Sequence, residues 1–191
     1  MWKSLVQGVI DYCSQLYYPM QSTELQNIEN LMKTYTKKIP EVSHLDYWSR
    51  LKHLKMYSQQ RRAERYKIIY IWKILEGLVP NCGVEESDES ERRGRLCKVP
   101  VCRGKQSIKT LREQSFQVAG LRIFNSLPKY LRQIKKNSSV DFKEELDLFL
   151  AKLPDQPHIG DQVPHICDQL TANPSNSLVD VMAHKNAYGG G

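Results

Sequence analysis

The chain has 191 residues, a net charge of +7 at pH 7 and a hydrophobic content of 40%. This length accommodates one domain with a tail, and this composition supports one modest core. The first apolar run is interrupted by Gln7, Gly8 and Asp11, which excludes a signal peptide and a membrane span there. Five cysteines, an odd number without a secretory signal, argue against a disulfide scaffold. We therefore expect an intracellular, reducing compartment, with no preference between nucleus and cytoplasm, and no membrane partner.

The first forty residues have the periodicity of two helices. Pro19 stops a first helix whose apolar face holds Leu5, Val9, Tyr12 and Leu16. A second helix is predicted from Thr23 to about Ile39, because Thr23 and Gln26 have the spacing of a capping box and Pro40 follows. Its apolar face comprises Leu25, Ile28, Met32, Tyr35 and Ile39. The short turn between the two helices predicts a helical hairpin.

The next segment predicts a buried helix. A short helix is expected over residues 45–55, and Ser58 is placed to cap a longer helix over residues 59–76. Between residues 66 and 75 the longer helix is apolar on most of its circumference, which is typical of a helix surrounded by others. Gly77 fits the position just after its C-terminal end.

Charge is distributed in blocks. Residues 33–75 carry 11 bases and 3 acids, residues 76–91 carry 6 acids and no base, and residues 92–136 carry 13 bases and one acid. Residues 81–112 show no firm periodicity, so we expect a long loop that is acidic first and basic afterwards. Within it, residues 95–101 have the composition of a short strand without a visible partner. The two basic blocks predict attraction to a phosphate backbone.

Three helices are predicted beyond the loop. One covers residues 115–126, and a short one follows the break at Pro128. Ser138 with Asp141 caps the last helix, which buries Phe142, Leu146, Phe149, Leu150 and Leu153. Residues 154–191 are rich in Pro, Asp, Asn and Ser and have little periodicity.

These elements predict an all-α fold. We expect an irregular bundle of about six helices that forms one domain over residues 1–153, with the long charged loop at residues 81–112. Residues 154–191 are expected to form a flexible tail.

Two groups of cations are candidate contacts to RNA or DNA. The first, at the start of the apolar helix, contains Arg61, Arg62, Arg65 and Lys67. Arg61 and Arg65 are like charges four residues apart, so a phosphate or a carboxylate should offset their repulsion. Pairing with the acidic part of the loop, or capping nearby helix ends, is the alternative to nucleic acid. The second group lies in the loop and contains Arg93, Arg95, Lys98, Arg103, Lys105 and Lys109. Such contacts hold a backbone without reading its sequence.

No metal, cofactor or catalytic site is expected. Four residues separate Cys97 from Cys102, but a closed zinc site needs a second well-spaced pair, so we interpret them as ordinary reduced thiols. The chain has no Gly-rich phosphate loop, no G-x-S-x-G motif and no Asp-Asp dipeptide. Its densest acidic run, residues 86–91, is predicted to be a solvated loop.

A series of motifs occurs in a recognisable order. It runs Arg-Arg-x-x-Arg-Tyr from Arg61, the apolar helix, Gly-Leu-Val-Pro from Gly77, the basic loop, Phe-Asn-Ser-Leu-Pro from Phe124 and Phe-Lys…Leu-Asp from Phe142. This order resembles the region after the polymerase palm in non-LTR retrotransposon (LINE/jockey-like) reverse transcriptases. The segment from Val9 to Ser14 is similar to the family's sequence just upstream, so the resemblance covers about residues 5–150. Phe124 stands where the family commonly has tryptophan.

The resemblance implies a thumb-like helical region without its catalytic palm. The family's palm holds two metal ions with a Tyr-x-Asp-Asp-type motif, which is missing here, so we expect no polymerase activity. What remains would bind RNA or DNA non-specifically. Two alternatives stay open. One is a helical interaction scaffold, which binds a protein partner or self-associates through an exposed apolar face. The other is a retroelement remnant without a selected function.

Overall fold

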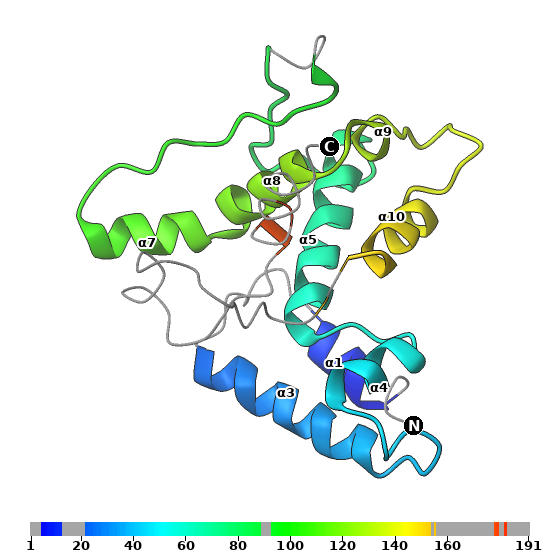
Figure 1. Cartoon of the computed structure of the whole chain (residues 1–191). Helices are drawn as coiled ribbons and strands as arrows, with labels where there is room; N and C mark the ends of the chain where they lie inside the picture. The colour runs from blue at the N-terminus through cyan, green and yellow to red at the C-terminus, as the bar shows by residue number, and fades with distance from the viewer. Residues whose placement is uncertain are drawn as a thin grey trace, which may run out of the picture. The chain divides into compact units, whose positions relative to one another are not determined.

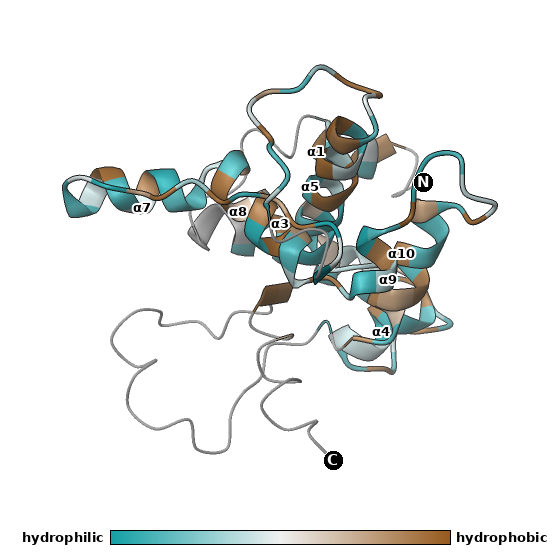
Figure 2. Ribbon diagram, turned by 90° about the horizontal axis from the view of Figure 1, so that it is seen from above, coloured by the Kyte–Doolittle hydropathy of each residue, from teal (hydrophilic) through white to brown (hydrophobic). Residues whose placement is uncertain are grey.

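The computed structural model describes residues 5–12, 22–88, 93–153, 155, 178–179 and 182 (Figure 1). This part contains eight helices: α1 (Gln7–Asp11), α3 (Ser22–Lys37), α4 (Tyr47–His53), α5 (Gln59–Leu75), α7 (Gln106–Gln114), α8 (Phe116–Ser126), α9 (Lys129–Arg132) and α10 (Phe142–Ala151). Polar and apolar residues alternate along them (Figure 2). The described residues contain no β-strand, so the predicted all-α fold is confirmed. The flexibility predicted for residues 154–191 falls almost wholly outside the described residues.

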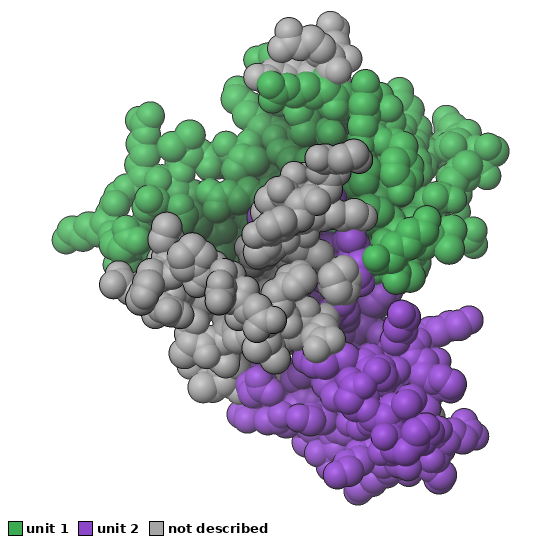
Figure 3. Space-filling model, in the orientation of Figure 1, with its two compact units in different colours: residues 1–20, 63–152 green, residues 21–62, 153–191 purple. Residues whose placement is uncertain are grey.

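The chain divides into two compact units (Figure 3). Unit 1 comprises residues 1–20 and 63–152, and unit 2 comprises residues 21–62 and 153–191. Helix α1 belongs to unit 1 and α3 to unit 2, so the hairpin predicted for the first two helices stays a prediction. The division falls within α5, whose first turn belongs to unit 2 and whose remainder belongs to unit 1.

The apolar part of α5 is the core of unit 1, as its sequence predicts. Trp72 stacks on Phe142 of α10 with the ring centroids 4.8 Å apart, and its indole N–H donates to the carbonyl of Ile134 at 2.8 Å. Tyr70 meets Phe116 of α8 edge to face at 5.4 Å. Aromatic pairs of this geometry contribute about 1 kcal/mol beyond the burial of their area. Residues from α8 and α10 thus anchor to the same helix.

The C-terminal end of α5 is closed by Gly77. This glycine has φ +67°, a left-handed conformation that side chains disfavour. Its N–H donates to the carbonyl of Ile74 at 3.0 Å, and the N–H of Leu78 donates to the carbonyl of Lys73 at 2.9 Å. This pair of bonds is a Schellman motif, which satisfies carbonyls that the helix leaves without partners.

Helix α1 exposes its predicted apolar face to solvent. The side chains of Leu5, Val9 and Tyr12, from the predicted apolar face, are 63%, 75% and 77% exposed, whereas Gln7 is buried. Gln7 donates to the Asp11 carboxylate at 2.9 Å, and that carboxylate also accepts from a hydroxyl of α5. The apolar pattern therefore does not mark the inner side of α1, which is taken by the buried Gln7 and the half-buried Asp11.

Unit 2 joins α3 to α4 through polar contacts around a small core. Met32 is fully buried, as the second predicted helix requires. The buried Arg50 of α4 donates to the carbonyl of Leu45 at 2.6 Å and to the hydroxyl of Thr36 at 3.2 Å. The carboxylate of Asp46 caps α4, accepting two backbone N–H groups at 3.0 and 3.1 Å. The predicted short helix is therefore confirmed, with its cap and its partner helix identified.

The predicted loop at residues 81–112 is only partly a loop. Its basic end forms the first turns of α7, which the sequence prediction missed because nine residues with two apolar positions give a weak periodic signal. An antiparallel bridge pairs Glu86, in the acidic part of the loop, with Cys97, in its basic part. This bridge supplies the partner that the strand predicted over residues 95–101 lacked. The N-terminal cap of α10 is Asp141 alone, whose carboxylate accepts the N–H groups of Lys143 and Glu144, and Ser138 contributes no capping bond.

Replacing Gly77 tests the Schellman motif. A methyl group there would meet nothing within 4 Å, so Gly77→Ala introduces only backbone strain, and we expect a loss of about 1 kcal/mol in the free energy of unfolding. Gly8, inside α1, has equally open surroundings but ordinary helical dihedrals. Gly8→Ala should therefore stabilise the chain by about 0.5 kcal/mol. Chemical denaturation of both variants measures the difference, and equal effects would contradict the assignment.

Candidate nucleic-acid interface

The first group of predicted cations lies mostly inside the protein. Arg61 is 1% exposed, and its Nε is 3.5 Å from the carboxylate of Asp155. Asp155 also accepts from the N–H of Ser58 at 2.6 Å and from its hydroxyl at 2.7 Å. The Ser58 hydroxyl in turn accepts the N–H of Arg61 at 3.1 Å, which confirms Ser58 as the cap of α5. Ser58 thus caps the start of α5, with Asp155 bound to it and Arg61 beside that carboxylate.

Arg65 is held by a second carboxylate. Its guanidinium makes a two-point contact with Asp147 of α10, at 2.5 Å from Nε and 2.6 Å from Nη2. Paired bonds of this kind are the strongest geometry available to arginine. The carboxylate alternative to phosphate is therefore realised for Arg61 and Arg65, but Asp155 and Asp147 supply it and the acidic loop does not. Arg62, between them, is half-buried.

Lys67 is also unsuited to hold a phosphate. It is 3% exposed, and burial lowers the pKa of its ammonium group, while the charge of Glu64 opposes that shift. A lysine that reaches a nucleic-acid backbone has to extend into solvent. The four positions predicted from the sequence thus form a largely internal set.

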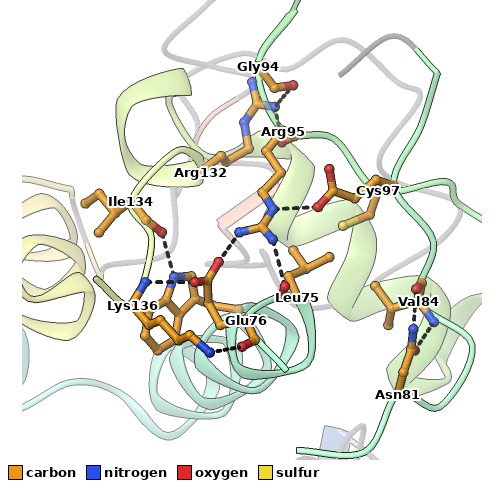
Figure 4. A network of polar contacts seen from close by, with 12 residues as sticks. Leu75, Glu76, Asn81, Val84, Gly94, Arg95, Cys97, Arg132, Ile134 and Lys136 are labelled. Atoms are coloured by element: carbon orange, nitrogen blue, oxygen red, sulfur yellow. Dashed lines mark hydrogen bonds and ion pairs between the residues drawn. The ribbon is translucent and has the colours of Figure 1, made fainter. Parts of the chain in front are cut away.

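Arg95 belongs to the second predicted group, is half-buried and is committed to internal partners (Figure 4). Its guanidinium binds Glu76, donates to the carboxylate of Glu86 at 2.8 Å and donates to the carbonyl of Leu75 at 2.8 Å. Glu76 also accepts from the N–H of Lys136 at 2.8 Å. Burial alone would raise the pKa of Glu76, but these donors and the charges of Arg95 and Lys136 outweigh it and hold that pKa below its usual value.

Two residues that hold the loop were not predicted as functional. Arg132 is 7% exposed and donates to the carbonyls of Leu127, Gly94, Arg95 and Arg93 at 2.6 to 3.2 Å. Asn125 holds the backbone of Cys97 with two hydrogen bonds. Its amide oxygen accepts the Cys97 N–H at 2.8 Å, and its amide nitrogen donates to the Cys97 carbonyl at 2.7 Å. The Phe-Asn-Ser-Leu-Pro motif signalled Asn125, whereas Arg132 has no sequence signal that separates it from exposed arginines.

Among the cations of the two predicted groups, the exposed ones lie in the second group. We name residues 98–112 the basic arm, which contains five bases, Lys98, Arg103, Lys105, Lys109 and Arg112, and no acid. Lys98 is 68% exposed, with Glu85 3.9 Å away and equally exposed. Arg103, Lys105 and Arg112 are exposed and Lys109 is half-exposed. Arg93 precedes the arm and is exposed, while its carbonyl accepts from Arg132.

The cysteines have no arrangement suited to chemistry in the described part of the chain. Cys97 is buried, and burial raises the pKa of its thiol to about 12, which makes it unreactive at neutral pH. Cys82 is exposed and Cys102 is half-buried. Among the residues described, no three His, Cys, Asp or Glu side chains are grouped so that they could hold a metal ion.

Comparison with known proteins gives no relative: no protein-family model, curated protein or solved structure matches the chain. Within the described ranges, none of the helices has the length and apolar character needed to cross a bilayer.

Glu76→Gln tests the pair with Arg95. Because the side chain of Glu76 is 6% exposed and that of Arg95 is 14% exposed, we expect the variant to lose about 3 kcal/mol of unfolding free energy at neutral pH. Since the folded pKa of Glu76 is lowered, its contribution is complete above the ordinary value of 4.5 and is lost as pH falls through the folded pKa. The free energies of unfolding of the variant and of the unmodified protein, measured by denaturation, should therefore converge as the pH is lowered.

Glu85→Gln is the control for this experiment. It removes a carboxylate of the same loop from a pair in which both partners are at least 68% exposed, so its effect should be about 0.5 kcal/mol or less. Equal losses for the two variants, or a pH-independent loss for Glu76→Gln, would contradict the assignment.

Asp155→Ala tests whether the start of the predicted tail is part of unit 2. The variant removes the carboxylate beside the buried Arg61 and two acceptors of Ser58, so we expect a loss of about 3 kcal/mol. Asp88→Ala, at an exposed acid of the loop, is the matched control and should be neutral. A thermal denaturation series measures both, and a neutral Asp155→Ala would show that this residue belongs to a loose tail.

Proposed function

We propose that the chain is a palm-less relative of the post-palm, thumb-like region of non-LTR retrotransposon reverse transcriptases. In this proposal it binds RNA or DNA non-specifically through the basic arm and catalyses no reaction. The observation that carries the binding proposal is the arm itself, with five bases, no acid and its side chains mostly exposed. A polyanion gains affinity from such a surface by releasing its counterions.

The motifs behind the resemblance support this proposal because they contact one another. The Arg65 guanidinium binds Asp147, which joins the Arg-Arg-x-x-Arg-Tyr motif to the Leu-Asp motif. Tyr66 donates to Asp11 at 3.1 Å, which joins it to the upstream segment. Asn125 of the Phe-Asn-Ser-Leu-Pro motif holds the basic loop at Cys97. A common framework of contacts thus links the motifs on which the resemblance rests.

The same contacts move the proposed binding site away from α5. Guanidinium groups that already hold partly buried carboxylates gain little from a phosphate, since exchanging partners leaves a partly buried acid without its cation. We therefore assign phosphate contact to Lys98, Arg103, Lys105, Lys109 and Arg112. Arg61, Arg65, Lys67 and Arg95 position the fold that carries the arm.

A second candidate function is a protein-interaction scaffold. The exposed apolar face of α1, formed by Leu5, Val9 and Tyr12, favours it. The scaffold would self-associate or bind a protein whether or not nucleic acid is present, which light scattering with and without RNA distinguishes.

The salt dependence of binding tests the proposed function. Five neutralised phosphates give a slope of about −4.5 in a plot of log affinity against log salt for a duplex, so affinity should fall about 500-fold between roughly 50 and 200 mM salt. The variant K98Q/R103Q/K105Q/K109Q/R112Q should lose most of this slope. Fluorescence anisotropy with a labelled duplex measures it.

A charge-matched control separates the arm from net charge. The variant K33Q/K37Q/K38Q/K52Q/K143Q removes five positive charges from exposed positions outside the arm. It should keep the slope of the unmodified protein. A flat salt response of the unmodified protein, or equal losses in the two variants, would overturn the proposal.

A further inference from the structure

Helix α7 is largely exposed, with only Lys109 and Glu113 half-buried. None of its nine residues is buried, although it carries two large apolar side chains, Ile108 at 46% and Leu111 at 69% exposure. Val101, earlier in the basic arm, is 77% exposed. In Figure 2, α7 extends beyond α8 with apolar and polar residues in turn along it. A helix of this length is marginal in water when it stands alone, so a ligand that covers its apolar side would stabilise it.

The apolar and basic residues of α7 lie beside one another. Ile108 and Leu111 are three residues apart, which makes them neighbours on the helix surface. Lys105, at the N-terminal boundary, Lys109 and Arg112 follow at intervals of four and three residues and define an adjacent face. Arg112 is also four residues after Ile108, so it lies at the border of the two faces. A ligand that meets this border has to offer negative charge and apolar surface together.

Unpaired nucleotides have this combination. A single strand exposes both its phosphates and the apolar faces of its bases, whereas a duplex hides the base faces by stacking them. Charge alone favours the duplex, because its phosphates are more densely spaced. A preference for single strands would therefore have to come from Ile108 and Leu111. This reasoning rests on the proposed function and specifies the nucleic acid that it uses.

We propose that the basic arm binds unpaired RNA or DNA, with phosphates on Lys105, Lys109 and Arg112 and base faces against Ile108 and Leu111. The proposal explains why the two aliphatic side chains remain exposed at the edge of a basic face. The five bases of the arm supply the charge complementarity, and no acid within it opposes them.

The test compares a fluorescein-labelled oligouridylate with a duplex of the same length. The variant Ile108→Gln/Leu111→Gln leaves the charge unchanged and replaces exposed positions, so it should fold normally. Its affinity for the oligouridylate should fall about tenfold, the effect of leaving two aliphatic side chains uncovered. Its affinity for the duplex should change less than about twofold. Leu111→Tyr should strengthen oligouridylate binding, because a ring stacks on bases better than an aliphatic chain does.

A matched control changes two exposed apolar residues elsewhere in unit 1. Val140→Gln/Leu148→Gln replaces side chains that are 43% and 57% exposed, and it should leave both affinities unchanged. Equal effects of the α7 variant on both ligands, or no effect on either, would overturn the single-strand proposal while the salt slope of the arm keeps the proposed function intact. Failure of the unmodified protein to bind either ligand would overturn both.

Discussion

The burial of α5 is the constraint on which the rest of the structure depends. This helix opens with three arginines and a lysine, of which Arg61 and Lys67 are buried and Arg62 and Arg65 are half-buried. An unpaired buried charge costs several kcal/mol, so each guanidinium requires an acid in a fixed position. Asp155 meets Arg61 and Asp147 meets Arg65. At the other end of the helix, Glu76 meets Arg95.

These pairs determine which cations remain for a partner. A cation that is part of the folding framework cannot also carry most of a binding energy. The basic arm is different, because its bases contribute no buried side chain and α7 packs none of its residues into the core. The residues just before the arm are nevertheless held in place, because the side chains of Asn125 and Arg132 bind the backbone around Cys97. The backbone of residues 93–97 is thus fixed to the fold, and the basic arm that follows it is exposed.

The sequence predicted the elements whose signals are local. The helix expected over residues 59–76 is observed from Gln59 to Leu75, with Ser58 and Gly77 at its ends, because a long apolar period, a cap and a left-handed glycine act within a few residues of one another. The weaker signals failed. Helix α7 has too few apolar positions to be recognised, and the buried side of α1 is polar.

The partners of the cations could not be predicted from the sequence. Arg65 and Asp147 are 82 residues apart, and Ser58 and Asp155 are 97 apart. At such separations a basic residue has many acids to choose from, and only the packing of helices decides among them. A cluster of arginines therefore has the same sequence signal whether it faces solvent or an internal carboxylate.

Hydrogen–deuterium exchange on the full chain, with and without an unstructured oligonucleotide at low salt, tests the central claim most directly. If the cations of α5 are committed to internal carboxylates and those of the arm are available, added oligonucleotide will slow exchange over residues 98–114 and leave residues 59–67 unchanged. Slower exchange at the start of α5, with none in the arm, would contradict the account.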